Sequence, residues 1–147
     1  MPAELIIKLL DPTIPLPGYQ HEGDAGLDLP SRVNITLEPG ERAMVPTGIA
    51  LAIPKGYAGF VLPRSGLAAR NGISLVNTPG LIDSGYRGEV TVVMINTDKN
   101  AAFSVKKGDR IAQLVIQRVE TVDVIEVDDL DDTTRGAGGF GSTGLRS

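Results

Sequence analysis

The chain has 147 residues, 41% of them apolar, and a formal net charge of -4 at neutral pH. This length and composition predict a single globular domain with a packed core rather than a disordered chain. An acidic chain is not expected to bind polynucleotide backbones, and the lack of cysteine excludes disulfides, thiol nucleophiles and Cys-ligated zinc. The available chemistry is that of carboxylates, hydroxyls, amides, arginine and hard cations.

Short runs of apolar and β-branched residues recur along the chain between turn signals. The first run, residues 5–10, is too short to span a membrane, so we expect it to form a strand in a cytoplasmic protein with no membrane anchor. Further runs cover residues 33–37, 48–53, 57–62, 89–95 and 110–116. This spacing predicts an all-β protein in which many short strands form a sandwich or barrel.

Asp28 lies between Leu27 and Leu29 in a short predicted strand. A carboxylate between apolar neighbours could hold a metal-bound water, because Mg²⁺ takes oxygen ligands and usually keeps several waters. An exposed aspartate on an edge strand is the alternative. The only histidine, His21, precedes this segment and is expected in a loop rather than at a metal, since no second histidine can pair with it.

One short helix is expected after Ser65, through Arg70, with its end at Asn71 and Gly72. The start of a helix presents free N–H groups and partial positive charge, and Arg64 would add a cation, so an anion could bind there. Taken alone, the segment is explained more simply by a serine N-cap beside a solvated arginine.

Residues 77–88 predict a tight β-hairpin that turns near Ser84 and Gly85. Asp83 would flank this turn and could act as a general base that deprotonates a water, although aspartate is common beside turns. In the next predicted motif, Gln113 interrupts an otherwise apolar strand. Its amide could donate to a phosphate or simply face solvent.

The last part of the chain differs from the rest in composition, being acidic and then rich in glycine. We expect a folded domain over residues 1–127, followed by an acidic hinge and flexible arm over residues 128–147. The glycine-rich arm cannot bury enough apolar surface to fold by itself. Phe140 could stack on a flat ligand while Arg135 and glycine N–H groups bind an anion, or it could be an incidental aromatic in a tail. The arm also matches G-x-G-x-x-G, but a dinucleotide-binding site needs a strand before it and a helix after it.

Five ordered segments closely resemble the motifs of the trimeric dUTPase family. They are residues 25–29, 63–66, 80–88, 108–113 and 135–144. The resemblance spans nearly the whole chain and implies a distorted jelly roll, a β-barrel-like sandwich, assembled as a homotrimer with three shared active sites. It also implies Mg²⁺-assisted hydrolysis of dUTP to dUMP and diphosphate, which keeps uracil out of DNA and supplies dUMP for thymidylate synthesis.

Other functions remain open beside this one. A dCTP deaminase, or a bifunctional dCTP deaminase–dUTPase, would use the same fold and would release ammonia. The segment from Asp83 to Tyr86 and the glycine arm favour the simple diphosphatase. A nucleotide-binding module without turnover is disfavoured by the presence of Asp83, Asp28 and the arm residues, and a structural jelly-roll subunit would need none of the five segments.

The resemblance assigns roles to individual residues. Asp83 is expected to activate the water that attacks the α-phosphorus, and the ring of Tyr86 to pack under the deoxyribose, where a 2′-OH would clash. Asp28 is expected to reach Mg²⁺ through water. The residues expected to form the uracil pocket, several through their backbone, are Asn77, Leu81, Ile82, Asp83 and Thr91.

The remaining roles concern the phosphates and the arm. Arg64, Ser65 and Gly66 are expected to bind phosphate from a second chain, with Gln113 as a further contact. In the arm, Phe140 is expected to stack on uracil and Arg135 to contact the γ-phosphate. The arm residues expected to enclose the triphosphate are Gly141, Ser142 and Thr143.

Overall fold

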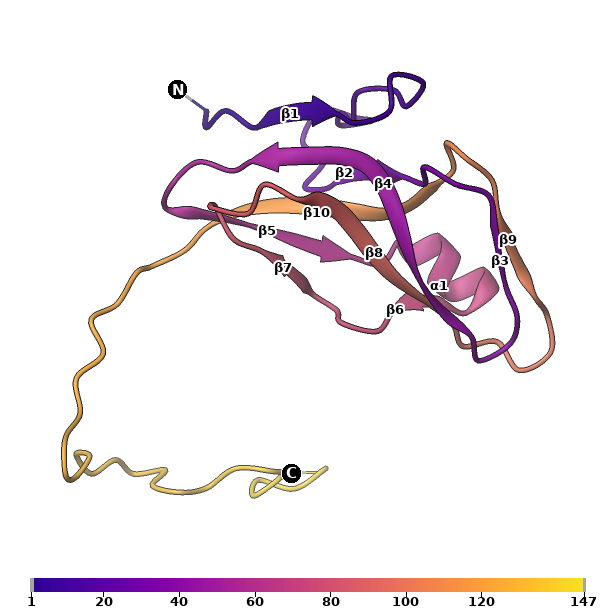
Figure 1. Ribbon diagram of the computed structural model, residues 1–147. Helices are drawn as coiled ribbons and strands as arrows, with labels where there is room; N and C mark the ends of the chain where they lie inside the picture. The colour runs from indigo at the N-terminus through magenta and orange to yellow at the C-terminus, as the bar shows by residue number, and fades with distance from the viewer. Residues whose placement is uncertain (1, 147) are drawn as a thin grey trace.

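The computed structural model describes residues 2–146, which form ten strands and one helix (Figure 1). In chain order they are β1 (Ile6–Leu9), β2 (Leu27–Pro30), β3 (Ile35–Leu37), β4 (Arg42–Ala52), β5 (Tyr57–Leu62), α1 (Ser65–Asn71), β6 (Ile73–Leu75), β7 (Gly80–Ile82), β8 (Glu89–Asn96), β9 (Phe103–Val105) and β10 (Arg110–Arg118). Among residues 2–146, no helix has the length and apolar character needed to cross a membrane.

The strands form two four-stranded antiparallel sheets and a two-stranded ribbon. One sheet has the order β1-β4-β8-β6, the other has the order β2-β10-β5-β7, and β3 pairs with β9. Strands far apart in sequence therefore become neighbours, as β10 pairs with both β2 and β5. This arrangement confirms the predicted all-β, jelly-roll-like sandwich.

The core lies between the two sheets because alternate residues of each strand point inward. In β8, Val90, Val92 and Met94 are buried while the residues between them are half-buried. They share one apolar cluster with Leu29 of β2 and Leu114 of β10, from the opposite sheet. Burying whole aliphatic side chains of this kind contributes about 1.5–3 kcal/mol each.

A bulge in β4 shapes the region next to the start of β8. The pairing of β4 with β8 shifts register between Pro46 and Ala50, and Gly48 has a φ of +76°, which favours glycine. Proline is tolerated within a sheet at such bulges because it cannot donate to the strand ladder. The N–H of Gly48 instead donates to the carboxylate of Glu89 at 2.9 Å.

The expected helix is confirmed, and its end has a clear physical cause. Gly72 adopts the left-handed conformation at φ +66° and donates its N–H to the last turn of α1. The expected serine cap is wrong: Arg64 occupies the N-cap position, without a side-chain cap, and Ser65 is the first helical residue.

The expected hairpin over residues 77–88 is also wrong. A turn does form, with the N–H of Tyr86 donating to the carbonyl of Asp83 at 3.1 Å. However, β7 pairs with β5 and β8 pairs with β4 and β6, so the two strands flanking the turn belong to different sheets. The turn is a connection between the two layers of the sandwich, and it closes one end of the space between them.

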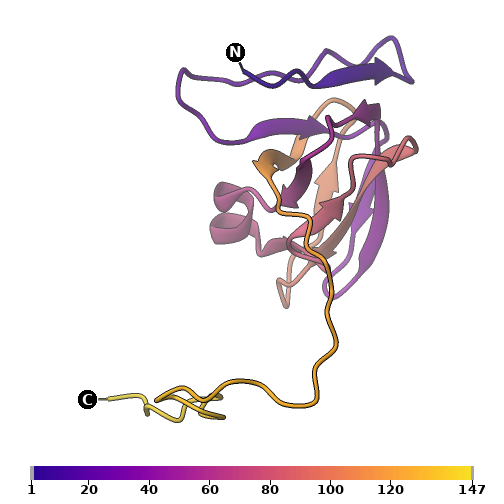
Figure 2. The same cartoon turned by 90° about the vertical axis from the view of Figure 1, so that its left-hand side faces the viewer.

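After β10 ends at Arg118, the chain forms no further helix or strand up to residue 146. Figures 1 and 2 show this segment leaving the two sheets and running away from them. Apart from Gly138 and Gly139, which are half-buried, its residues are exposed. The expected boundary between the folded domain and the arm, at residue 128, thus lies within this segment, ten residues after the end of β10.

Candidate active site

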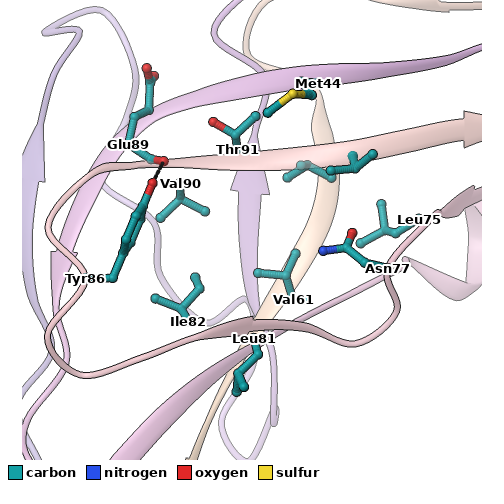
Figure 3. Close-up of a pocket in the computed structure, with 13 residues that line it drawn as sticks. Met44, Val61, Leu75, Asn77, Leu81, Ile82, Tyr86, Glu89, Val90 and Thr91 are labelled. Carbon is teal, nitrogen blue, oxygen red and sulfur yellow. Dashed lines mark hydrogen bonds between the residues drawn. The ribbon is translucent and has the colours of Figure 1, made fainter.

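A pocket of about 270 Å³ opens between β7 and β8, where the two sheets meet the connecting turn (Figure 3). Five of the residues expected to bind the nucleoside line it: Asn77, Leu81, Ile82, Tyr86 and Thr91. Its inner wall is apolar, with Val61 from β5 and Val90 from β8. Mostly apolar walls with few polar groups are typical of small-molecule pockets.

The polar groups of this pocket include the side chains of Asn77, Tyr86, Glu89 and Thr91, and a free strand edge adds backbone groups. The side-chain amide of Asn77 points into the pocket, whereas the side chain of Leu81 points away from it and is 61% exposed (Figure 3). Leu81 lies on β7, the last strand of its sheet. An edge strand leaves a row of backbone N–H and C=O groups unpaired, which suits recognition of a base by backbone groups.

The turn that closes the pocket is held by local hydrogen bonds. Besides the Tyr86–Asp83 backbone bond, the Arg87 guanidinium donates to the carbonyl of Ser84 at 2.6 Å. The Tyr86 hydroxyl donates to the carbonyl of Glu89 at 2.9 Å. The side chain of Asp83 projects from this turn and is exposed, so its carboxylate is accessible to a water or a ligand.

A network of charged side chains anchors the start of β8. Arg32 lies 3.2 Å from the Glu89 carboxylate and 3.6 Å from Asp11, and the Lys107 ammonium lies 2.9 Å from Asp11. Hydrogen bonds from the Thr13 side chain, then from Lys107, hold the pKa of Asp11 well below its usual range. The network connects the nucleoside pocket to the loop that precedes β10.

A second cluster lies at the other end of the β5 sheet and brings together Asp28, Arg64 and Gln113. The half-buried Asp28 carboxylate lies 3.4 Å from Arg64 and 3.5 Å from Arg110. The Gln113 amide donates to the carbonyl of Pro63 at 2.9 Å. Two guanidinium groups and an amide beside one carboxylate form a site suited to phosphate oxygens.

Ser65 and Gly66 follow Arg64 as the first two residues of α1. Gly66 lies against the guanidinium of Arg70, which would be 2.7 Å from a Cβ atom at that position. Sequence reasoning did not single out Arg70, Arg110 or Glu89. Arg110 stands within one of the five segments, but a charged residue at the start of a strand has an ordinary explanation as a solvated side chain.

The two clusters are separated within one chain. Asp83 follows β7 beside the start of β5, because Ile82 pairs with Gly59, whereas Arg64 follows the end of β5. β5 has six residues, so its five residue-to-residue steps of about 3.3 Å place these ends roughly 16 Å apart. The turn that carries Asp83 therefore lies near one end of β5 and the cationic cluster near the other, while the pocket itself extends along β7 to Val61, which pairs with Gly80.

The arm residues contact neither cluster, and their hydrogen bonds are local. Arg135 donates to the carbonyl of Gly138 at 2.7 Å, and the N–H of Ser142 donates to Gly139 at 3.0 Å. Phe140 is fully exposed and has a φ of +48°. Gly141 and Thr143 lie in the same exposed turns.

Residues 2–146 contain no group of three or more His, Cys, Asp or Glu side chains arranged to hold a metal ion. His21 lies in an exposed turn with its ring 3.4 Å from Asp24, as expected for a loop residue. Asp28 is the one carboxylate in the cationic cluster. This donor set fits an ion held mainly by ligand oxygens and water, with Asp28 accepting from a bound water, and does not fit an all-protein cage.

Comparison with known proteins adds independent evidence. The dUTPase family model matches residues 13–144. A deoxyuridine 5'-triphosphate nucleotidohydrolase of Thermobifida fusca is 60% identical over 138 residues, covering 94% of this chain and 77% of that protein. The structure of Staphylococcus bacteriophage 80alpha dUTPase with dUpNHpp has a TM-score of 0.90 and 31% identity, covering 97% of this chain and 99% of that one. A mutant dUTPase of phage phi11 of S. aureus, described with a structural Mg(II) ion, has a TM-score of 0.81 and 27% identity. That match covers 88% of this chain and 99% of the phage protein. The family match includes both clusters and most of the arm.

Proposed function

The chain belongs to the dUTPase family, and we propose that it hydrolyses dUTP to dUMP and diphosphate. The observation that carries this proposal is the pocket between β7 and β8, with an exposed Asp83 carboxylate on the turn that closes it. The family match is to dUTPases, so a dCTP deaminase or bifunctional enzyme is not favoured. We place the reaction in the cytoplasm, where it would keep uracil out of DNA and provide dUMP for thymidylate synthesis.

Uracil would bind along the free edge of β7. A fixed row of backbone donors and acceptors, with the amide of Asn77, can pair with the polar edge of one base and leave another unpaired. Leaving buried polar groups unpaired is costly, and a site built around such groups can reject the wrong ligand by about 10⁴–10⁵ in rate. The apolar wall of the pocket would limit the space beside the base.

Asp83 would act as the general base of the reaction. Its carboxylate would take a proton from a water as the water oxygen forms a bond to the α-phosphorus. The bond from the α-phosphorus to the bridging oxygen would break, and diphosphate would leave with the electron pair. Because Asp83 lies on a turn held by hydrogen bonds, the backbone that carries its carboxylate is fixed before the reaction.

The phosphate chain would bind at the cationic cluster, with Arg64 and Gln113 redirected from Asp28 and Pro63 to phosphate oxygens. Ser65 and Gly66 would add contacts at the start of α1. Asp28 would then hold Mg²⁺ through a bound water. When bound, the ion neutralises phosphate charge and holds the chain of phosphates in one geometry.

We infer that the active site is shared between subunits of a homotrimer. The roughly 16 Å between the two ends of β5, beside which Asp83 and Arg64 lie, supports a site in which one chain contributes the nucleoside pocket and a second contributes the phosphate contacts. The arm supports a third contribution, because it leaves its own body and contacts neither cluster there. On a neighbouring subunit, Phe140 could stack on the base while Arg135, Gly141, Ser142 and Thr143 enclose the triphosphate.

Subunit mixing tests the shared site. Asp83→Asn and Arg64→Ala are each expected to lose most dUTP hydrolysis as pure proteins. In trimers formed by mixing equal amounts of the two, about a quarter of shared sites would contain both intact residues, so about a quarter of the wild-type activity should return. A site built within one chain predicts no recovery at all.

A further inference from the structure

The ring of Tyr86 is positioned by the two residues that follow Arg87. Figure 3 shows the Tyr86 ring standing at one end of the nucleoside pocket, with its hydroxyl joined to the backbone of Glu89. The same end of the ring lies directly against Gly88. A Cβ atom at position 88 would be 2.5 Å from the Tyr86 hydroxyl oxygen, 2.7 Å from Cζ and 3.0 Å from Cε1.

Backbone conformation does not explain the glycine at position 88. Its φ lies outside the left-handed region, so an L-residue could adopt the same backbone, and the position is exposed. The three nearest atoms that a Cβ would meet all belong to the Tyr86 side chain. Glycine is therefore needed at this position for the space that the ring occupies.

The acceptor for the Tyr86 hydroxyl is itself held in place. Glu89 begins β8, and its carboxylate accepts from the Gly48 N–H at 2.9 Å and lies 3.2 Å from Arg32. These contacts fix the residue whose carbonyl receives the hydroxyl. The hydroxyl end of the ring therefore has an anchored acceptor at Glu89 and lies against the backbone of Gly88.

We propose that Gly88 is a specificity-determining residue that sets the position of the Tyr86 ring and, through it, the discrimination between 2′-deoxyribose and ribose nucleotides. This rests on the proposed function and on the role that the resemblance to the dUTPase family implies for the ring, which is to pack under the deoxyribose. A methyl group at position 88 would push the ring by about 1 Å to reach ordinary contact distance. A shift of this size is comparable to the space that separates a sugar C2′ hydrogen from a hydroxyl.

The chain provides a matched control for this proposal in Gly85, which lies in the same turn. A Cβ atom at position 85 would meet nothing within 4 Å, and its φ is also outside the left-handed region. In Gly88→Ala, the ratio of kcat/KM for dUTP to kcat/KM for UTP should fall by about tenfold or more. Gly85→Ala should keep the wild-type ratio.

A second comparison separates an effect on the ring from an effect on the backbone. In a Tyr86→Ala background there is no ring to displace, so adding Gly88→Ala should leave the dUTP-to-UTP ratio of that background unchanged. This comparison is measurable even if the single Gly88→Ala variant folds poorly, because the collision is absent from the double variant. Circular dichroism and molecular mass would confirm that each variant remains folded and assembled.

The possible results are distinct. An unchanged ratio in Gly88→Ala, an equal fall in Gly85→Ala, or a fall that persists without Tyr86 would each overturn the proposal. A wild-type protein that failed to hydrolyse dUTP would instead refute the proposed function, and this is measured first in the same series.

Discussion

Asp28 and Gln113 occupy paired positions on β2 and β10, so a carboxylate and a carboxamide lie side by side on the same face of the sheet. On its other side Gln113 pairs with Leu62, the last residue of β5, and its amide reaches the carbonyl of Pro63. Arg64 follows and contacts Asp28. One line of paired residues across three strands therefore assembles the cationic cluster from three remote parts of the sequence.

The position of Asp28 in this cluster predicts a specific magnesium phenotype. In Asp28→Asn, the Mg²⁺ concentration that gives half-maximal dUTP hydrolysis should rise by about 10–100-fold, the usual cost of removing an outer-shell partner. A titration of activity against Mg²⁺ measures this. Asp83→Asn, at the opposite end of β5, should leave the half-saturating Mg²⁺ concentration of its residual activity unchanged. An unaltered Mg²⁺ requirement in Asp28→Asn would remove this residue from the metal site.

The exposed carboxylate of Asp83 predicts a loss of turnover without a loss of binding. Asp83→Asn should lower kcat by about 10²–10⁴, since general base catalysis contributes effects of that size. The affinity for dUpNHpp, measured by calorimetry, should stay within a few-fold of wild type. Glu38→Gln, at an exposed acidic residue that lines neither the nucleoside pocket nor the hollow beside Arg64 and Arg110, is the control and should retain full turnover. Near-normal kcat in Asp83→Asn would exclude it as the base.

The arm allows a matched pair of alanine substitutions. Phe140 and Leu145 are both large, apolar and almost fully exposed. If Phe140 stacks on uracil, Phe140→Ala should lower kcat/KM for dUTP by an amount corresponding to about 1–3 kcal/mol. Leu145→Ala should have little effect, and neither change should alter the melting temperature. Equal effects of the two substitutions would mean that Phe140 has no specific contact with the base.

The pKa of Asp11 predicts how one contribution to stability depends on pH. Hydrogen bonds from Thr13 and Lys107 lower this pKa below its ordinary value of 3.8, so the folded state favours the charged carboxylate. The resulting stabilisation is fully present above pH 3.8 and is lost as the pH falls below that value. Asp11→Asn should therefore have a lower melting temperature than wild type at pH 7, and the difference should shrink as the pH is lowered below 3.8. A difference that stays constant down to pH 2 would contradict this linkage.

The elements predicted from the sequence are those whose signals are local. The helix end at Gly72 depends on one left-handed residue, and β5 and β8 follow from runs of apolar and β-branched residues. The hairpin was predicted wrongly because a turn sequence specifies the reversal of the chain but not which sheet each flanking strand joins. That choice depends on long-range pairing of β7 with β5 and of β8 with β4.

The same distinction applies to the site. Residues with unusual local settings, such as Asp28 between two leucines or Gln113 in an apolar strand, could be selected from the sequence, and the structure places both in one cluster. Arg110 and Glu89 could not, because their positions are ordinary until the fold brings Asp28 and Gly48 against them. The separation of Asp83 from Arg64 likewise depends on the register of β5 with β7.

Phosphorus NMR of dUTP incubated with the assembled protein and Mg²⁺ tests the central claim most directly. The proposed activity predicts that the triphosphate signals disappear while dUMP and diphosphate signals grow in equal amounts, without release of ammonia. Unchanged dUTP, or release of ammonia with the triphosphate intact, would contradict the proposed activity.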